Sequence, residues 1–456
     1  MTESRSTVGA TRALAEFVAE TPAAAIPSTV RTNAIDTVID SYATLMAGYR
    51  EPTAETIRAG LLPGSGSGRC VVPGLADRLV DPASAALFNA SAAHSLDYDS
   101  ISFAVSGFVG SAALFALSAL ADETGYSGAD VLTAYCLGWE GAAALGRALV
   151  PEHYALGWHP TATMSGFAAA FAASRLFGLD AERTVAAMSA VTSETSGIKI
   201  MIGNMINGYH VGKAARNGLN AALLARAGFV GHPDPLEHVQ GLFALFSGPT
   251  GPHPERAVAG LGERWDLLDP GPVFKIYACC GLVHSALDGV IALCTEHDIA
   301  PDEIVRATVW VHEYVPKVMQ VQRPDTGYAA KFCIPYCVAA GLRDRRAGLA
   351  PFDTVDPGLV ALGERVEVRV HPELHGGDTF FEKEFTDVSI ETTRGVFGRR
   401  IQRLANRGSG PLERPALFEK FADCVGRSDA VSVDPATSFE RLSLMDTTED
   451  WTLWRE

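Results

Sequence analysis

The sequence lacks the short motifs that mark several large enzyme classes. It contains no G-x-G-x-x-G segment after a predicted strand, no G-x-x-x-x-G-K-[S/T], no G-x-S-x-G and no H-E-x-x-H. These motifs hold nucleotides or phosphates on glycine-rich loops, present a serine nucleophile, or bind zinc through two histidines. The local sequence therefore gives no support to a nucleotide-binding, serine-hydrolase or zinc-protease function.

Cysteine is sparse, and its spacing excludes the common metal and disulfide frameworks. The eight cysteines in 456 residues form no C-x-x-C pair, and Cys279 and Cys280 are adjacent. We therefore expect no metal site and no disulfide scaffold, which is typical of the reducing cytoplasm. Residues 1–20 have no uninterrupted apolar run of the kind found in signal peptides, which also favours a cytoplasmic location.

Positive charge is in deficit as well. There are 37 Lys and Arg against 53 Asp and Glu, a net charge of −16, which argues against nucleic acid or an anionic membrane as partner. A hydrophobic content of 47% with 20% charged residues excludes a disordered or coiled-coil chain. Residues 103–121 carry no charge and are long enough to span a membrane. Their Ala, Ser and Gly content favours a tightly packed core helix instead, so we expect no membrane partner.

Residues 8 to about 260 predict one helix after another. Ala-rich segments, separated by loops with Gly, Pro and Asp, predict helices over 82–96, 129–149, 166–176, 181–192 and 212–227. Asp81 before Pro82 and Asp180 before Ala181 are N-cap signals. Several of these segments are apolar on all sides, which is typical of helices buried in a large bundle.

The pattern changes near residues 269–272. Beyond them, β-branched residues predict strands at 307–311, 365–370 and 387–393, with helical patterns at 284–296 and 329–342. From residue 412 onward the pattern is helical again. We therefore predict a mainly α protein with an α+β part. A large all-helical domain is built from both chain ends (1–270 with 401–456), and a smaller α+β lid domain (271–400) is inserted.

Two histidine-containing segments follow helices. Residues 94–99, His-Ser-Leu-Asp-Tyr-Asp, combine His94 with Asp97 and Asp99 at the end of an Ala-rich helix. Such charged groups form either the edge of a pocket or a helix cap. Residues 157–161, Gly-Trp-His-Pro-Thr, place His159 in a loop before proline. That histidine is either a general acid or base or a structural loop residue.

A third segment, residues 209–218, places cations on one helix face. His210, Lys213 and Arg216 fall at i, i+3 and i+6 at the predicted start of a helix. A helix N-terminus with such side chains is suited to an anion. A solvated, purely structural face explains Lys213 and Arg216 equally well.

A fourth segment, residues 274–284, lies at the predicted domain junction, where ligand sites are common. Lys275 and His284 stand on either side of Cys279-Cys280-Gly281. A site role and a plain surface role remain open for Lys275 and His284. The two cysteines are more typical of small core residues than of nucleophiles.

Together these segments resemble the MmgE/PrpD family, which includes 2-methylcitrate dehydratase, cis-aconitate decarboxylase and iminodisuccinate epimerase. The matching strings occur in the family's order and are His94–Asp99, Gly157–Thr161, His210–Gly218, Lys275–Cys280 with His284, and Ala330–Tyr336. The resemblance implies a large helical domain with an α+β lid, a homodimer, and chemistry without metal or cofactor. It also implies a small-molecule carboxylate substrate.

The implied reaction is proton transfer at a carbon beside a carboxylate, followed by loss of hydroxide, decarboxylation or reprotonation. Because that carbon acid is weak, cations in a dry pocket must neutralise the carboxylate and the enolate charge. By motif, His159 is implied as general acid or base, Lys275 as a carboxylate ligand and Asp97 as an orienting group. We also expect substrate contacts from His94, His210, Lys213, Arg216, Cys280 and His284.

The chain departs from the family pattern at several cationic positions. Where the family carries a histidine-containing loop ending in His-Pro-Ser-Gly, this chain has residues 100–107 without histidine. The lysine that the family often places shortly before the match to His210 is absent from residues 204–209, and a family histidine near Cys280 is absent too. We therefore predict a substrate different from methylcitrate and cis-aconitate.

Three functions remain open from the sequence. The leading one is a cofactor-independent lyase, specifically a dehydratase. The second is an epimerase or isomerase, because residues 157–161 and 214–218 are similar to the epimerase member of the family. The third is a binding protein that kept the fold without the chemistry, which a pocket filled by Phe103 and its neighbours would favour.

Overall fold

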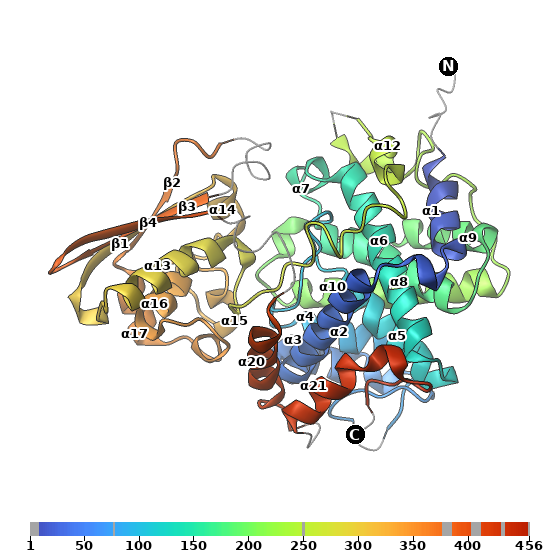
Figure 1. Cartoon of the computed structure of the whole chain (residues 1–456), viewed down its shortest axis with the longest axis horizontal. Helices are drawn as coiled ribbons and strands as arrows, with labels where there is room; N and C mark the ends of the chain where they lie inside the picture. The colour runs from blue at the N-terminus through green and yellow to red at the C-terminus, as the bar shows by residue number, and fades with distance from the viewer. Residues whose placement is uncertain are drawn as a thin grey trace.

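The computed structural model describes residues 9–75, 78–248, 251–375, 385–402, 412–429 and 434–454. Within these ranges, helices precede and follow one small sheet, which lies to one side of the molecule (Figure 1). The predicted fold class, mainly α with an α+β part, is confirmed. No helix in these ranges is long and apolar enough to cross a membrane.

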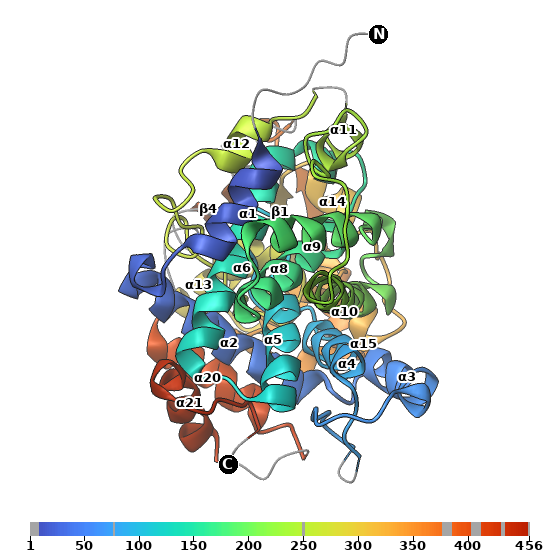
Figure 2. The same cartoon turned by 90° about the vertical axis from the view of Figure 1, so that its right-hand side faces the viewer.

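The larger part, which we call the helical lobe, begins with a series of helices. Their bounds are α1 Ala10–Glu20, α2 Ser28–Gly48, α3 Pro52–Gly60, α4 Pro82–His94, α5 Gly110–Thr124, α6 Gly128–Leu149, α7 Glu152–Ala155, α8 Pro160–Leu176, α9 Ala181–Ser193, α10 Ile206–Arg226, α11 Leu242–Phe246 and α12 Pro254–Val258. Helix α8 packs against α5, α6, α9 and α10 (Figure 2). Almost all of α8 is buried, so it forms the centre of the lobe.

Small residues allow these helices to lie unusually close together. A Cβ atom on Gly212 of α10 would lie 2.2 Å from the Leu87 carbonyl oxygen of α4. A Cβ on Gly218, one and a half turns further along α10, would lie 2.3 Å from the Gly166 carbonyl oxygen of α8. Helix α10 is therefore clamped between α4 and α8, and this fixes the side chains at its N-terminal end.

Two predicted helices begin earlier than expected. Helix α8 starts at Pro160 rather than at residue 166, and α10 starts at Ile206 rather than at residue 212. The side-chain oxygen of Asn204 accepts the backbone N–H of Ile206 and so helps to begin α10. The prediction that Lys213 and Arg216 stand at a helix start is therefore wrong, because both lie well inside α10.

The uncharged segment 103–121 is a core helix for most of its length, as predicted. Helix α5 begins at Gly110, and every residue from Gly110 to Ala121 is buried. Residues before Gly110 form a loop, in which Ser102 pairs with Gly107 as an isolated bridge. This loop returns the chain from the end of α4 to the start of α5.

The smaller part, which we call the sheet lobe, contains four strands in the order β2-β1-β3-β4, with bounds Val366–Val370, Ile304–Val311, Phe385–Thr392 and Gly395–Gln402. Strands β1 and β2 are parallel, and the other neighbours are antiparallel. Among the residues that the structure describes here, the helices are α13 His284–Glu296, α14 Tyr314–Val318, α15 Gly327–Ala330, α16 Ile334–Asp344 and α17 Pro357–Gly363. Helix α13 packs on β3 and β4, and α16 packs on α13 and β2.

Two details of the sheet lobe differ from the sequence prediction. Strand β4 was not predicted, because Gly395, Gly398 and consecutive arginines interrupt the alternation of apolar residues. The predicted helix 329–342 is two helices, because Cys333 is the N-cap of a new helix, α16, which starts at Ile334 and has Pro335 in its first turn. The break leaves Lys331 between the two helices.

The C-terminal segment returns to the helical lobe. Helices α20 (Arg414–Val425) and α21 (Pro435–Ser443) pack against α2, and both views place them beside it (Figures 1 and 2). Lys420 of α20 is buried and forms an ion pair with Asp40 of α2 at 2.5 Å. The predicted domain boundaries near residues 270 and 400 stay predictions.

Candidate active site

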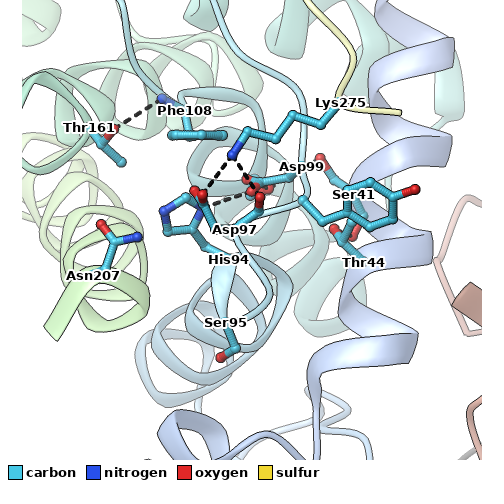
Figure 3. A network of polar contacts seen from close by, with 12 residues as sticks. Ser41, Thr44, His94, Ser95, Asp97, Asp99, Phe108, Thr161, Asn207 and Lys275 are labelled. Atoms are coloured by element: carbon cyan, nitrogen blue, oxygen red, sulfur yellow. Dashed lines mark hydrogen bonds and ion pairs between the residues drawn. The ribbon is translucent and has the colours of Figure 1, made fainter. Parts of the chain in front are cut away.

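A buried ion pair stands where the two lobes meet. The Lys275 Nζ atom lies 2.8 Å from Oδ2 of Asp97 and donates a second hydrogen bond, of 2.7 Å, to the Asp97 backbone carbonyl. Both side chains are about 95% or more removed from solvent. Figure 3 shows Lys275 passing beside the ring of Phe108, whose centroid lies 4.8 Å from Nζ. The amine is thus held by a carboxylate, a carbonyl and an aromatic face.

The backbone brings these two distant residues together. Ile101 and Val273 form an isolated antiparallel bridge with two hydrogen bonds of 2.9 Å, which places the segment after α4 beside the segment that leads to Lys275. Asp97 has a φ of 50°, in the left-handed region that Asp tolerates better than most residues. This turn presents both the carbonyl and the carboxylate of Asp97 to the same amine.

A second buried pair lies next to the first. His94, the last residue of α4, donates from Nδ1 to the Asp99 carboxylate at 2.7 Å, and Ser111 donates to the other carboxylate oxygen at 2.8 Å. The His94 ring also packs on Phe108, with centroids 4.4 Å apart. Within the described part of the chain, Nε2 of His94 is buried and has no hydrogen-bond partner. The two roles considered for this segment, pocket edge and helix cap, stay predictions.

Two more histidines meet between α8 and α10. His159 is the N-cap residue of α8 and His210 lies in the second turn of α10. Their Nδ1 atoms are 2.9 Å apart, which is a hydrogen bond between the rings. The backbone N–H of His159 donates to the Gly197 carbonyl at 3.1 Å, which fixes the turn before α8.

Burial keeps both rings neutral. It lowers the pKa of His210 to about 4, with further contributions from Lys213 and His94. Burial also lowers the pKa of His159 well below its usual value, and His210 and His94 add to the effect. At neutral pH the two imidazoles are therefore uncharged, and each retains one nitrogen that accepts and one that donates a proton.

The sheet lobe contributes polar groups to the same region. Asn207 of α10 donates from Nδ2 to the Tyr328 hydroxyl at 3.1 Å, and its Oδ1 atom is buried without a partner among the residues that the structure describes. Burial, with the negative charge of Asp97 nearby, raises the pKa of Tyr328, so its hydroxyl stays protonated. In Figure 3 Asn207 stands on the side of His94 opposite to Asp99.

A second buried lysine stands behind the ion pair. Lys331 donates from Nζ to the Ala278 carbonyl at 2.8 Å, and burial lowers its pKa to about 8 although Glu51 and Asp97 oppose the shift. The backbone N–H of Cys280 donates to the Lys331 carbonyl at 3.1 Å. Burial and the charge of Asp97 raise the pKa of the Cys280 thiol to about 12, so the thiol is not a nucleophile.

A cavity of about 420 Å³ lies between the two lobes near His159. One wall is formed by Gly157 and the segment around Lys199, and the other by the segment around Lys317 together with Phe332. Lys199 donates to the Tyr154 carbonyl at 2.8 Å, and its pKa is lowered by burial and by the like charge of Lys317. The cavity therefore combines apolar surface with two cations, of which Lys317 also pairs with Glu313 at 2.8 Å.

Three of the predicted contact residues point to other partners. Lys213 donates from Nζ to the Ser196 carbonyl and hydroxyl, both at 2.7 Å, and Arg216 donates to the Asn217 side chain at 3.3 Å. The Nε2 atom of His284, at the start of α13, lies 3.2 Å from the Cys279 carbonyl oxygen. Their roles in substrate binding stay predictions.

Sequence reasoning assigned no individual role to several residues that the structure brings into the site, namely Phe108, Ser111, Asn207, Tyr328 and Lys331, and it considered Asp99 only as a pocket-edge or capping group. The nearest sequence signals are the carboxylate two residues after Asp97 and a lysine within an otherwise apolar segment at 329–342. Neither signal shows that the side chain is buried or what it contacts. Among the described residues, no three His, Cys, Asp or Glu side chains are grouped to hold a metal ion.

Comparison with known proteins agrees with this layout. The MmgE/PrpD N-terminal domain matches residues 12–255, and the MmgE/PrpD C-terminal domain matches residues 277–437. The chain belongs to the MmgE/PrpD family. The resemblance read from the five motif strings is thereby confirmed.

Relatives of this MmgE/PrpD protein include several cis-aconitate decarboxylases. The one from Aspergillus terreus (strain NIH 2624 / FGSC A1156) is 29% identical over 389 residues, which cover 80% of this chain and 77% of the relative. Those from Homo sapiens and Mus musculus are 25% and 24% identical, over 76% of this chain and 73% and 72% of each relative. The prediction of an enzyme of the MmgE/PrpD lyase type is confirmed at this level.

Proposed function

We propose that this chain is a lyase that removes a proton from the carbon beside a carboxylate of a small organic acid and expels hydroxide. The observation that carries the proposal is the buried Asp97–Lys275 pair. Phe108 connects it to His94, whose charge in turn acts on the neutral imidazoles of His159 and His210. An ammonium group has three N–H donors, and two of those on Lys275 go to Asp97. We assign the third, on the side of the Phe108 ring, to a substrate carboxylate.

This arrangement supports chemistry on a carbon acid for a physical reason. Loss of the proton builds negative charge on the substrate carboxylate, and a fixed cation in a dry site stabilises that charge far more strongly than water does. Neutral imidazoles are competent proton acceptors at neutral pH, whereas charged ones are not. The residues of the chain thus supply the charge and the base, and the proposed mechanism requires no metal or cofactor.

The charge balance of the site supports a substrate with fewer carboxylates than methylcitrate or cis-aconitate. Lys275 is neutralised by Asp97, and the Nζ atom of Lys331 is turned to a backbone carbonyl. The additional cationic positions of the family are absent from residues 100–107 and 204–209. The cavity with Lys199 at its edge has room for an apolar part of the substrate with a single remote anionic group.

Decarboxylation is the second candidate, because the relatives that the chain matches over about three quarters of its length are named cis-aconitate decarboxylases. It requires release of carbon dioxide and one proton donor, and no leaving hydroxide. The two reactions therefore give different products from hydroxy acids and from unsaturated acids.

The test is incubation of the purified chain with a panel of hydroxylated and unsaturated di- and tricarboxylic acids that includes cis-aconitate. Products are followed by proton NMR. We expect water loss from a hydroxy acid, no turnover by Lys275→Met, and unchanged turnover by Arg306→Met, which removes an exposed cation of the sheet lobe. If the only reaction observed were carbon dioxide release from cis-aconitate, the proposed function would be decarboxylation and not dehydration. Configurational change alone would make the protein an epimerase, and a folded but silent protein would contradict catalysis on this panel.

A further inference from the structure

The contact between His159 and His210 determines which nitrogen of each ring carries a proton. The two Nδ1 atoms are 2.9 Å apart, and the rings are tilted by 50° with centroids 5.2 Å apart. Only one proton fits between two hydrogen-bonded nitrogens, since one must donate and the other accept. When both rings are neutral, the donor ring has a bare Nε2 and the acceptor ring carries its proton on Nε2.

We propose that His159 and His210 act as one unit that presents a base at one Nε2 atom and an acid at the other. This inference rests on the proposed lyase function and identifies the groups that move its two protons. His210 then becomes a catalytic residue in its own right, not a support for His159. The pair fills both proton-transfer roles without the loop histidine and the lysine that residues 100–107 and 204–209 lack.

The elimination balances within this pair. The bare Nε2 takes the proton of the substrate C–H bond, whose electrons form the new carbon–carbon double bond. The same ring passes its Nδ1 proton to the Nδ1 atom of the second ring. The second ring gives its Nε2 proton to the leaving hydroxyl group, the carbon–oxygen bond breaks and water is released. Neither ring carries a net charge at the start or at the end. After product release the first ring gives its Nε2 proton to water, the Nδ1 proton moves back to the first ring, and water supplies a new proton to Nε2 of the second ring.

The surroundings favour this charge-neutral exchange. Charge on either ring is disfavoured by burial and by the groups that face the pair, which are His94 from α4, His153 from α7, Lys199 from the following loop and Lys213 from α10. All four of these groups are basic, so their charges oppose protonation of either ring. The nearby carboxylates act on these groups, Asp99 through a hydrogen bond to His94 and Glu194 through its charge on Lys213. A proton passed between Nδ1 atoms avoids the cost of a buried charge.

The backbone beside His210 requires glycine at position 197. Gly197 has a φ of +137°, and a Cβ at that position would lie 3.3 Å from His210 Nε2 and 2.2 Å from the Ala162 Cβ. Any other residue there is strained and stands against the His210 ring. Glycine at 197 therefore keeps a side chain away from His210 Nε2.

The first test reads the protons directly, without substrate. Protein labelled with ¹⁵N-histidine is examined by long-range ¹H–¹⁵N NMR between pH 6 and 8. We expect two neutral rings of opposite tautomer, one protonated on Nδ1 and one on Nε2. In His210→Asn this pair of opposite tautomers is expected to disappear from the spectrum. Two rings of the same tautomer, or a charged ring at pH 7, would overturn the proposal whatever the activity.

The second test separates catalysis from positioning. In His210→Asn the amide occupies roughly the place of Nδ1 and still holds His159, but it has no acid or base at the Nε2 position. We expect kcat to fall by about 10²–10⁴-fold in both His210→Asn and His210→Ala, with KM little changed. His232→Asn, which alters an exposed histidine outside the site, keeps the wild-type rate. If kcat were near normal in His210→Asn but low in His210→Ala, His210 would be a positioning residue, and the proposal would be overturned. Opposite tautomers in a protein that turns over no acid of the panel would contradict the proposed lyase instead.

Discussion

Lys275 and Asp97, 178 positions apart in the chain, are joined twice by the same amine, through the carboxylate at 2.8 Å and through the backbone carbonyl at 2.7 Å. The first contact sets the charge of the site. The second fixes the left-handed turn at Asp97 that follows α4. Because the Lys275 amine both sets the charge of the site and fixes the turn, we expect substitutions of Asp97 or Lys275 to alter stability and activity by different amounts.

Asp97→Asn keeps a residue that tolerates the left-handed backbone but leaves Lys275 buried without its counter-charge. We expect a loss of about 3–5 kcal/mol in the free energy of unfolding, the cost of an unpaired buried charge. The double variant Asp97→Asn with Lys275→Met recovers most of that loss and stays inactive. Chemical denaturation and turnover assays measure the two quantities, and activity in the double variant would exclude the assigned role of Lys275.

An exposed pair provides the matched comparison. Arg306 and Glu391 lie on neighbouring strands at 2.9 Å, with about half of each side chain exposed. We expect Glu391→Gln to change the free energy of unfolding by less than about 1 kcal/mol, because solvent screens exposed pairs. An effect as large as that of Asp97→Asn would show that burial is not the reason for the difference.

Lys420 connects the C-terminal helix α20 to the site. Its amine pairs with Asp40 at 2.5 Å and donates to the Tyr98 carbonyl at 2.6 Å, between Asp97 and Asp99. We expect Lys420→Met to destabilise the fold by about 3–5 kcal/mol and to lower kcat, because Asp40 is left unpaired and the Asp97 turn loosens. Adding Asp40→Asn restores the stability. Unchanged kcat in a destabilised Lys420→Met protein would contradict the link between α20 and the site.

His153 gives the fold a defined response to acid. Its Nε2 atom lies 2.7 Å from the Thr163 hydroxyl, and burial lowers its pKa to about 4. Because the unfolded chain binds this proton at about pH 6.5, His153 destabilises the fold progressively as the pH falls from 6.5 to 4. The contribution is present in full above pH 6.5.

We expect His153→Asn to remove that part of the pH dependence, about 3 kcal/mol between pH 6.5 and pH 4. The quantity to measure is the difference in the free energy of unfolding between wild type and variant at each pH. The contributions of the buried carboxylates are the same in both proteins and cancel in this difference. Denaturation curves at several pH values give it directly. A difference that does not change with pH would show that His153 is not held neutral by the fold.

Close helix packing around α10 gives a further prediction. Gly212→Ala places a Cβ 1.9 Å from Ser91 Oγ and 2.2 Å from the Leu87 carbonyl, so α4 and α10 must separate. We expect a loss of about 1–3 kcal/mol in stability and a lower kcat, because His94 and His210 lie on these two helices. Gly60→Ala in α3 has open space around the new methyl group and is expected to be neutral or slightly stabilising. A tolerated Gly212→Ala would contradict the close approach of the helices.

The sequence singled out five residues that the structure buries, His94, Asp97, His159, His210 and Lys275, and their roles stay predictions. Their partners could not be predicted, because the contacts span up to 178 positions and depend on how the Ile101–Val273 bridge aligns two loops. Sequence spacing describes neighbours on one helix or strand and carries no information about such contacts.

The failures have physical reasons as well. The glycines at 208 and 212 resemble loop residues, yet at Gly212 the absence of a side chain is what lets α10 approach α4. Strand β4 has a glycine- and arginine-rich sequence and depends on pairing with β3 rather than on its own pattern. Lys331 and Lys420 look like surface lysines in the sequence, and only the tertiary structure shows that both are buried against backbone carbonyls.

The central claim is proton transfer at a carbon beside a carboxylate, and solvent deuterium tests it most directly. The protein is incubated in D₂O with the panel acid that shows turnover, and the substrate and product are followed by proton NMR. The account predicts that the carbon beside the carboxylate loses one hydrogen in the product, that deuterium enters it when the unsaturated acid is hydrated in the reverse direction, and that neither change occurs with Lys275→Met. Turnover by the wild-type protein with every hydrogen on that carbon retained from the substrate would contradict the account.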